Sequence, residues 1–179
     1  MDLRQYATEG VRAGLVGAII IAVWFLAVDT LAATPFFTPA MLGSALFAGA
    51  REPAAVQMSA ATIVGYTAVH VLVFAVFGMI AVVIVRQIER FPSTLFLAAV
   101  LFAAFEFSFY VMFALLGPSL LGAMALWSVA VGNAMAAVGM GWYIWRAHPQ
   151  LRERLAAHPL GAAVEESADA YRAANIPGE

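Results

Sequence analysis

The sequence contains no cysteine and no lysine, and only 11% of its 179 residues are charged. The absence of cysteine excludes disulfides, thiolate metal sites, iron–sulfur clusters and a cysteine nucleophile. The absence of lysine excludes Schiff-base chemistry through a lysine amine. Soluble domains contain roughly 25% charged residues, so we expect lipid to be the solvent for most of this chain. The net charge of −2 gives no electrostatic basis for binding nucleic acid, which we do not expect as a partner.

Four long apolar runs account for most of the 64% hydrophobic composition. A helix needs roughly 20 apolar residues to cross a hydrocarbon core ~30 Å thick. We therefore predict an all-α membrane protein with four transmembrane helices, near residues 13–33, 60–85, 93–116 and 120–145. The first run follows basic residues, as in a signal peptide. Asp2 and Glu9 in the same flank favour a helix that is retained.

The connection between the first two runs covers residues 34–58. Thr38 followed by Pro39 resembles an N-cap and a first-turn proline. One helical face then collects the apolar residues Met41, Leu42, Ala45 and Leu46. This segment is too short to span a bilayer. It predicts a short interfacial helix in the first outer loop, or a re-entrant piece.

Arginine placement predicts the orientation. In a four-span topology Arg51 falls alone on one side, and the other side holds Arg4, Arg12, Arg86, Arg90, Arg146, Arg152, Arg154 and Arg172. By the positive-inside rule both termini are cytoplasmic, and the lysine-free, alanine-rich composition points to the inner (plasma) membrane of a bacterium. Residues 1–145 then form the transmembrane domain, and 146–179 form a polar cytoplasmic tail. We expect His148 and His158 in that tail to be solvated.

Each apolar run contains one strongly polar residue, which gives the set Asp29, His70, Glu106 and Asn133. Counted at 1.5 Å per residue from the cytoplasmic arginines, the first three lie about 24–25 Å deep, and Asn133 lies about 20 Å deep. Charged groups in hydrocarbon are costly and usually find partners inside a bundle. Tyr66 and Tyr110 lie four residues from His70 and Glu106, so each tyrosine shares its neighbour's helical face.

This polar layer is compatible with several functions. Asp29, His70 and Glu106 are a plausible ligand set for zinc, iron or manganese. His70 alone is a candidate haem ligand, and the two acids are candidates for a proton or ion pathway. The simplest interpretation is interhelical hydrogen bonding that fixes helix packing. Such bonds average only ~0.6 kcal/mol, which favours a role in specificity over one in stability. The sequence alone identifies no cofactor.

The fourth run has small residues at four-residue intervals, namely Ser128, Gly132 and Ala136. Such a face lets two helices approach closely, either within the bundle or against a partner. The sequence has no G-x-S-x-G elbow, no H-E-x-x-H and no phosphate-binding glycine loop. These features favour a non-catalytic accessory or structural membrane subunit that associates with other membrane proteins or with itself. The alternative is an intramembrane metal, haem or proton-relay site built on Asp29, His70 and Glu106.

Residues 24–43 also contain a pattern, W-F-x-x-x-D…T-P-x-x-x-G. Its residues are Trp24, Phe25, Asp29, Thr38, Pro39 and Gly43. The pattern resembles a run shared by uncharacterised small bacterial four-span membrane proteins. The resemblance implies a membrane location and no assigned activity.

Overall fold

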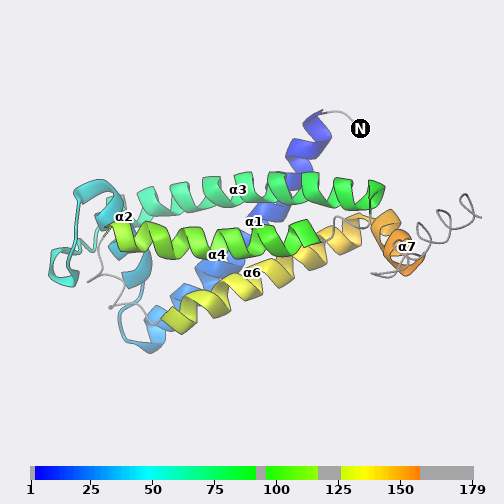
Figure 1. The fold of residues 1–179 in the computed structure, drawn as a ribbon. Helices are drawn as coiled ribbons and strands as arrows, with labels where there is room; N and C mark the ends of the chain where they lie inside the picture. Colours follow the sequence, from blue (N-terminus) through cyan, green and yellow to red (C-terminus); the bar gives the residue numbers. More distant parts are fainter. Residues whose placement is uncertain (1–2, 92–95, 117–125, 158–179) are drawn as a thin grey trace, which may run out of the picture.

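The computed structural model describes residues 3–91, 96–116 and 126–157, and these residues contain helices and loops without strands (Figure 1). The long helices are α1 (Leu3–Leu31), α3 (Ala60–Arg90), α4 (Phe96–Leu116) and α6 (Leu126–Ala147). The shorter elements are α2 (Phe37–Ala48), the 3₁₀ turn η1 (Pro53–Ala55) and α7 (Pro149–Ala157). In Figure 1, α2 lies at one end of the bundle, and α7 lies at the other end near the N-terminus. Residues 117–125, which include the start of the fourth predicted span, and the tail beyond residue 157 with His158 lie outside the described residues.

Two helices are long and apolar enough to cross a membrane. They are α1 over Arg4–Leu31 (28 residues) and α3 over Ala60–Glu89 (30 residues). α1 covers the predicted span 13–33 as far as Leu31, α3 contains the predicted span 60–85, and both helices extend beyond the span at the end nearer α7. Many of their large apolar side chains face outward, such as Ile19 at 61% and Val64 at 66% exposed. Exposure on this scale suits a surface that contacts lipid.

α1 and α3 run antiparallel and approach each other at glycines. A methyl group added at Gly14 would lie 2.1 Å from the carbonyl oxygen of Phe74. One added at Gly78 would lie 2.1 Å from the carbonyl oxygen of Gly10. The two backbones are therefore in contact with no side chain between them, as small residues at four-residue spacing allow. We call this contact between Gly10, Gly14 and Gly78 the glycine crossing.

α6 packs on α1 through its predicted small-residue face. The Trp24 indole Nε1 donates a hydrogen bond to the Ser128 carbonyl oxygen at 2.7 Å. A methyl group added at Gly132 would lie 2.8 Å from Cδ1 of the same tryptophan. Ala136 is buried in the main hydrophobic core. The face is thus filled by α1 of the same chain, which is the first of the two alternatives that the sequence left open.

α2 is a packed part of the bundle. It buries Thr38 and the whole stretch 40–45, mainly against α3. At Gly43 the backbones are again in contact, since a methyl group there would lie 2.1 Å from the Thr62 carbonyl oxygen. The predicted short helix in the first connection is therefore present, and it is covered on most of its faces.

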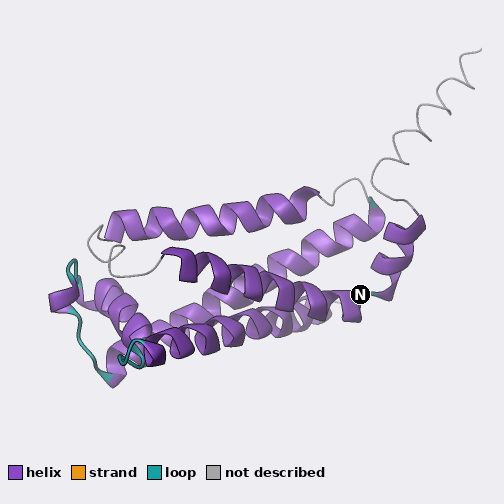
Figure 2. Cartoon of the chain, turned by 90° about the horizontal axis from the view of Figure 1, so that it is seen from below, coloured by secondary structure: helices purple, strands orange, loops and turns teal. Residues whose placement is uncertain are grey.

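The remaining two helices have different degrees of burial. α4 lies along the side of the bundle, beside α3 and α6 (Figure 2). α7 packs on the end of the bundle, where Leu151 joins a second core cluster with Ala13, Val85, Ile88 and Ile144. The first residues of the predicted polar tail are thus anchored to the helices.

Candidate functional site

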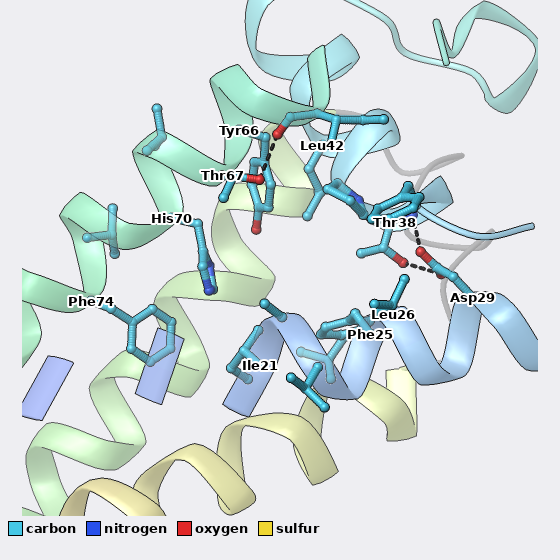
Figure 3. A pocket seen from close by; sticks show the side chains of 18 of the residues that line it. Ile21, Phe25, Leu26, Asp29, Thr38, Leu42, Tyr66, Thr67, His70 and Phe74 are labelled. Atoms are coloured by element: carbon cyan, nitrogen blue, oxygen red, sulfur yellow. Dashed lines mark hydrogen bonds between the residues drawn. The ribbon is translucent and has the colours of Figure 1, made fainter. Parts of the chain in front are cut away.

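Asp29 caps α2 from outside the helix. Its Oδ2 accepts the backbone N–H of Thr38 at 2.8 Å, and its Oδ1 accepts the Thr38 hydroxyl at 2.7 Å (Figure 3). The helix begins at Phe37, after Phe36 in a left-handed conformation (φ 64°). The prediction of Thr38 as the N-cap is therefore wrong. The first-turn N–H group that a capping side chain would satisfy bonds instead to a carboxylate nine residues earlier.

His70 is held by the backbone of α1. Its Nε2 lies 3.2 Å from the Ala18 carbonyl oxygen. A carbonyl only accepts hydrogen bonds, so Nε2 carries the hydrogen, and a neutral ring presents Nδ1 as an acceptor. The imidazole lies between Tyr66 and Phe74, with ring centroids 5.8 and 4.8 Å away. These three rings follow one another along α3 (Figure 3), and we call them the aromatic face.

Asn133 is a buried amide with an unpartnered donor. Its side chain is 6% exposed, and its Nδ2 has no hydrogen-bond partner among the described residues. A buried donor without a partner costs about 1–3 kcal/mol. Few such groups occur in a native protein, and each calls for a role.

Asp29, His70 and Asn133 all line one cavity of about 440 Å³ (Figure 3). Its walls come from α1, α2, α3 and α6, on the α2 side of the glycine crossing. Its deep wall includes the buried side chains Phe25, Phe74 and Val129. Its outer wall includes the exposed side chains Leu26, Leu46 and Val73. The cavity therefore opens sideways, between helices, toward the surroundings of the bundle.

A second cavity of about 290 Å³ lies between α3, α4 and α6. Phe74 and Asn133 belong to the walls of both cavities. Among the described residues that line the second cavity, Asn133 carries the only amide, and none carries a carboxylate or an imidazole. The unpartnered amide of Asn133 thus belongs to the wall shared by the two cavities, which are both largely apolar.

The structure groups the predicted polar layer differently from the sequence. Depth counting placed Glu106 with Asp29 and His70 and set Asn133 apart. In the structure, Asn133 shares the cavity with Asp29 and His70, and Tyr66 lines it too. Glu106 and Tyr110 line neither cavity. Within the described ranges, no group of three or more His, Cys, Asp or Glu residues is placed to hold a metal ion.

A second polar cluster, at the α7 end, was missed from the sequence. His148 is 2% exposed, and its Nδ1 lies 2.7 Å from Oε1 of Glu89. Its Nε2 makes an ion-pair contact with Glu9, out of hydrogen-bond alignment. Arg86 contacts both acids, at 3.5 Å from Glu9 and 3.0 Å from Glu89. We call these four residues the His148 network.

The expectation of a solvated His148 is therefore wrong. Each nitrogen of its buried ring faces one carboxylate, Nδ1 that of Glu89 and Nε2 that of Glu9, and Arg86 contacts both acids. In the sequence, Glu9, Arg86 and Glu89 all lie at one predicted membrane edge, and this shared position was the signal for a polar cluster. Composition alone treats such residues as solvated flanks of the spans.

The residues of the W-F-x-x-x-D…T-P-x-x-x-G pattern also acquire roles. Trp24 bonds to α6, Asp29 bonds to Thr38, and Gly43 lets α2 contact α3. Phe25 is in the core. In comparisons with known proteins, no family model, no curated protein and no solved structure matches this chain. Four residues of the pattern line the cavity of about 440 Å³, namely Phe25, Asp29, Thr38 and Pro39.

Proposed function

We propose that this chain is a membrane protein that binds a lipophilic molecule in the cavity between α1, α2, α3 and α6. The observation that carries the proposal is Asn133, a buried amide with an unpartnered Nδ2 on the wall of that cavity. Ligand sites are mostly apolar spaces of about 300–1,000 Å³ with a few placed polar groups. A cavity of about 440 Å³ with one amide and one imidazole fits that description.

The cavity wall defines the class of ligand. Nδ2 of Asn133 offers a hydrogen-bond donor, and Nδ1 of a neutral His70 offers an acceptor. The aromatic face supplies flat rings for an apolar body to pack on. The ligand is therefore an apolar molecule that carries a hydroxyl or carbonyl group. The sideways opening lets it enter from the bilayer.

The proposed setting is a four-span topology in a bacterial inner membrane, with both termini cytoplasmic. α1 and α3 supply two spans. We assign the other two to α4 and α6, whose 21 and 22 residues give lengths of about 32 Å. The one-sided arginine distribution supports the orientation.

The accessory or structural role predicted from the sequence stays a prediction. Part of its support was the face of Ser128, Gly132 and Ala136, which α1 fills. A partner subunit would have to bind another surface. The metal, haem and proton-relay alternatives have less support than ligand binding, because both oxygens of Asp29 are bonded to Thr38 and Glu106 lines neither cavity.

Asn133→Leu tests the proposal, with Val138→Leu as the control on the same helix. Val138 is 72% exposed, so its variant leaves both cavities intact. We purify all three proteins in mild detergent and analyse their organic extracts by mass spectrometry. Wild type and control should contain a lipophilic compound at about one per chain, which Asn133→Leu lacks.

The thermal stability of the same proteins separates a ligand group from a packing group. Asn133→Leu removes a buried unpartnered amide, so the ligand-free variant should unfold at a higher temperature than ligand-free wild type. An amide needed only for packing would instead lower the unfolding temperature when replaced. Retention of the compound by Asn133→Leu, or a wild-type extract with detergent and bulk lipid alone, would refute ligand binding.

A further inference from the structure

A polar cleft of about 450 Å³ opens at the α7 end of the bundle, between α1, α3 and α6. It is separate from the two apolar cavities, and its lining is dominated by arginine. Arg4 and Arg12 lie two turns apart on α1, and Arg86 comes from α3. Among the described residues that line it, Glu9 is the only acidic one.

The charges of this cleft are unevenly paired. Arg86 is paired with Glu9 and with Glu89, as part of the His148 network. Arg4 and Arg12 are exposed, and the described ranges of the chain contain no carboxylate within salt-bridge distance of either. The cleft therefore holds an excess of positive charge that points into solvent or into lipid headgroups.

A neutral group adds hydrogen-bonding capacity to the same cleft. Tyr143 of α6 lines it and carries a hydroxyl, whereas the hydroxyl of Thr8, another lining residue, already donates to the Arg4 carbonyl oxygen at 2.7 Å. α1 begins at Leu3, so Arg4 belongs to a first helical turn whose N–H groups lack intrahelical partners. The helix dipole is positive at that end. These features all favour an anionic ligand.

The depth of the cleft indicates which anion. The first predicted span begins at residue 13 and the second ends at residue 85, so Arg12 and Arg86 lie at the membrane edge. At the same end, Arg146 lies over the Trp142 ring, 4.2 Å from its centroid. Tryptophan and arginine are typical of the headgroup level. The cleft therefore faces the phosphates of the bilayer.

We propose that this cleft binds the phosphate headgroup of an anionic phospholipid. Guanidinium groups match phosphate oxygens in paired hydrogen bonds. Basic pockets between transmembrane helices on the cytoplasmic side bind anionic headgroups in this way. The inference is independent of the proposed ligand cavity, because the two sites share no lining residue.

The test uses the full chain in detergent and native mass spectrometry with dioleoyl phosphatidylglycerol. The test variant combines Arg4→Gln with Arg12→Gln. The matched control combines Arg51→Gln with Arg152→Gln, which removes the same charge at exposed positions outside the cleft. We expect the test variant to bind the lipid roughly tenfold or more weakly than wild type. The control should bind as wild type does.

Two further arms define the source of the phosphate. Zwitterionic dioleoyl phosphatidylcholine should bind weakly to all proteins, and inorganic phosphate should not displace phosphatidylglycerol. Wild-type affinity in the test variant would overturn the proposal, as would displacement by inorganic phosphate at the concentration of the lipid. Thermal unfolding without lipid checks the fold of the double variant, and the single Arg12→Gln variant replaces it if the double variant does not fold.

Discussion

Gly78→Ala tests the glycine crossing, which sets the distance between α1 and α3. The added methyl group would lie 2.1 Å from the Gly10 carbonyl oxygen and 2.5 Å from the Gly14 backbone nitrogen. Ordinary van der Waals contact begins at 3.4 Å, so the helices would have to separate by about 1.3 Å, the difference between the two distances. Both contacts are backbone atoms and cannot turn away as a flexible side chain can.

The expected loss of stability follows from that separation. A gap of ~0.5–1 Å already forfeits a quarter to a half of each dispersion contact, and overpacking costs about 1–3 kcal/mol. α1 and α3 form the most extensive helix pair of the bundle, so we expect the upper end, ~3 kcal/mol. Alanine regains about 1 kcal/mol of helix propensity. The free energy of unfolding should therefore fall by about 2 kcal/mol.

Gly141→Ala is the matched control, because nothing lies within 4 Å of a methyl group added there. It carries the same propensity gain, so its free energy of unfolding should be unchanged or up to about 1 kcal/mol higher. The four tryptophans give a fluorescence signal for unfolding in detergent. Equal shifts for Gly78→Ala and Gly141→Ala would refute the backbone contact between α1 and α3.

Three other predictions concern the polar contacts and the topology. Asp29→Ala should lower the free energy of unfolding by about 1–2 kcal/mol and speed hydrogen exchange in α2. The control Thr38→Ser keeps the hydroxyl and should have little effect. An equal loss of stability in both variants would contradict the capping role of Asp29. His148→Leu should lower the free energy of unfolding by about 3 kcal/mol, because it leaves two facing carboxylates with one arginine. Hydrogen exchange in α7 should become faster, and an unchanged rate would count against the His148 network. The chain has no cysteine, so the variants Glu52→Cys and Gln150→Cys each carry a single thiol that can report topology. In intact cells, an impermeant maleimide should label only Glu52→Cys. Labelling of Gln150→Cys would contradict the proposed orientation.

Sequence reading succeeded where the signal lies along a helix axis. The apolar runs 13–33 and 60–85 predicted transmembrane helices, and the structure has helices long and apolar enough to cross a membrane over Arg4–Leu31 and Ala60–Glu89. The spacing of Ser128, Gly132 and Ala136 predicted a close helix contact, and the structure contains one. What the spacing could not indicate was the partner, because small residues permit approach without specifying which helix approaches.

The predictions that failed concern the direction in which a side chain points around its helix axis. Depth counting treated Glu106 and Asn133 by level alone. The depth of a residue does not fix the side of the helix on which it lies, or the place of that helix in the bundle. In the structure, Glu106 of α4 lines neither of the two cavities. The N-cap assignment of Thr38 followed local statistics, which cannot anticipate a carboxylate supplied by Asp29 in the preceding helix.

The His148 network also bears on the order in which the chain is assembled. Synthesis runs from the N-terminus, so Glu9, Arg86 and Glu89 are made long before His148. Until that residue folds back onto α1 and α3, two carboxylates share a single arginine. All residues of the glycine crossing, by contrast, have been made once α3 is complete. The contact between the α1 and α3 backbones can thus form before the ionic cluster, which needs residue 148. A nascent chain that ends before residue 148 contains both helices of the glycine crossing but lacks His148, so its ionic cluster at the α7 end is incomplete.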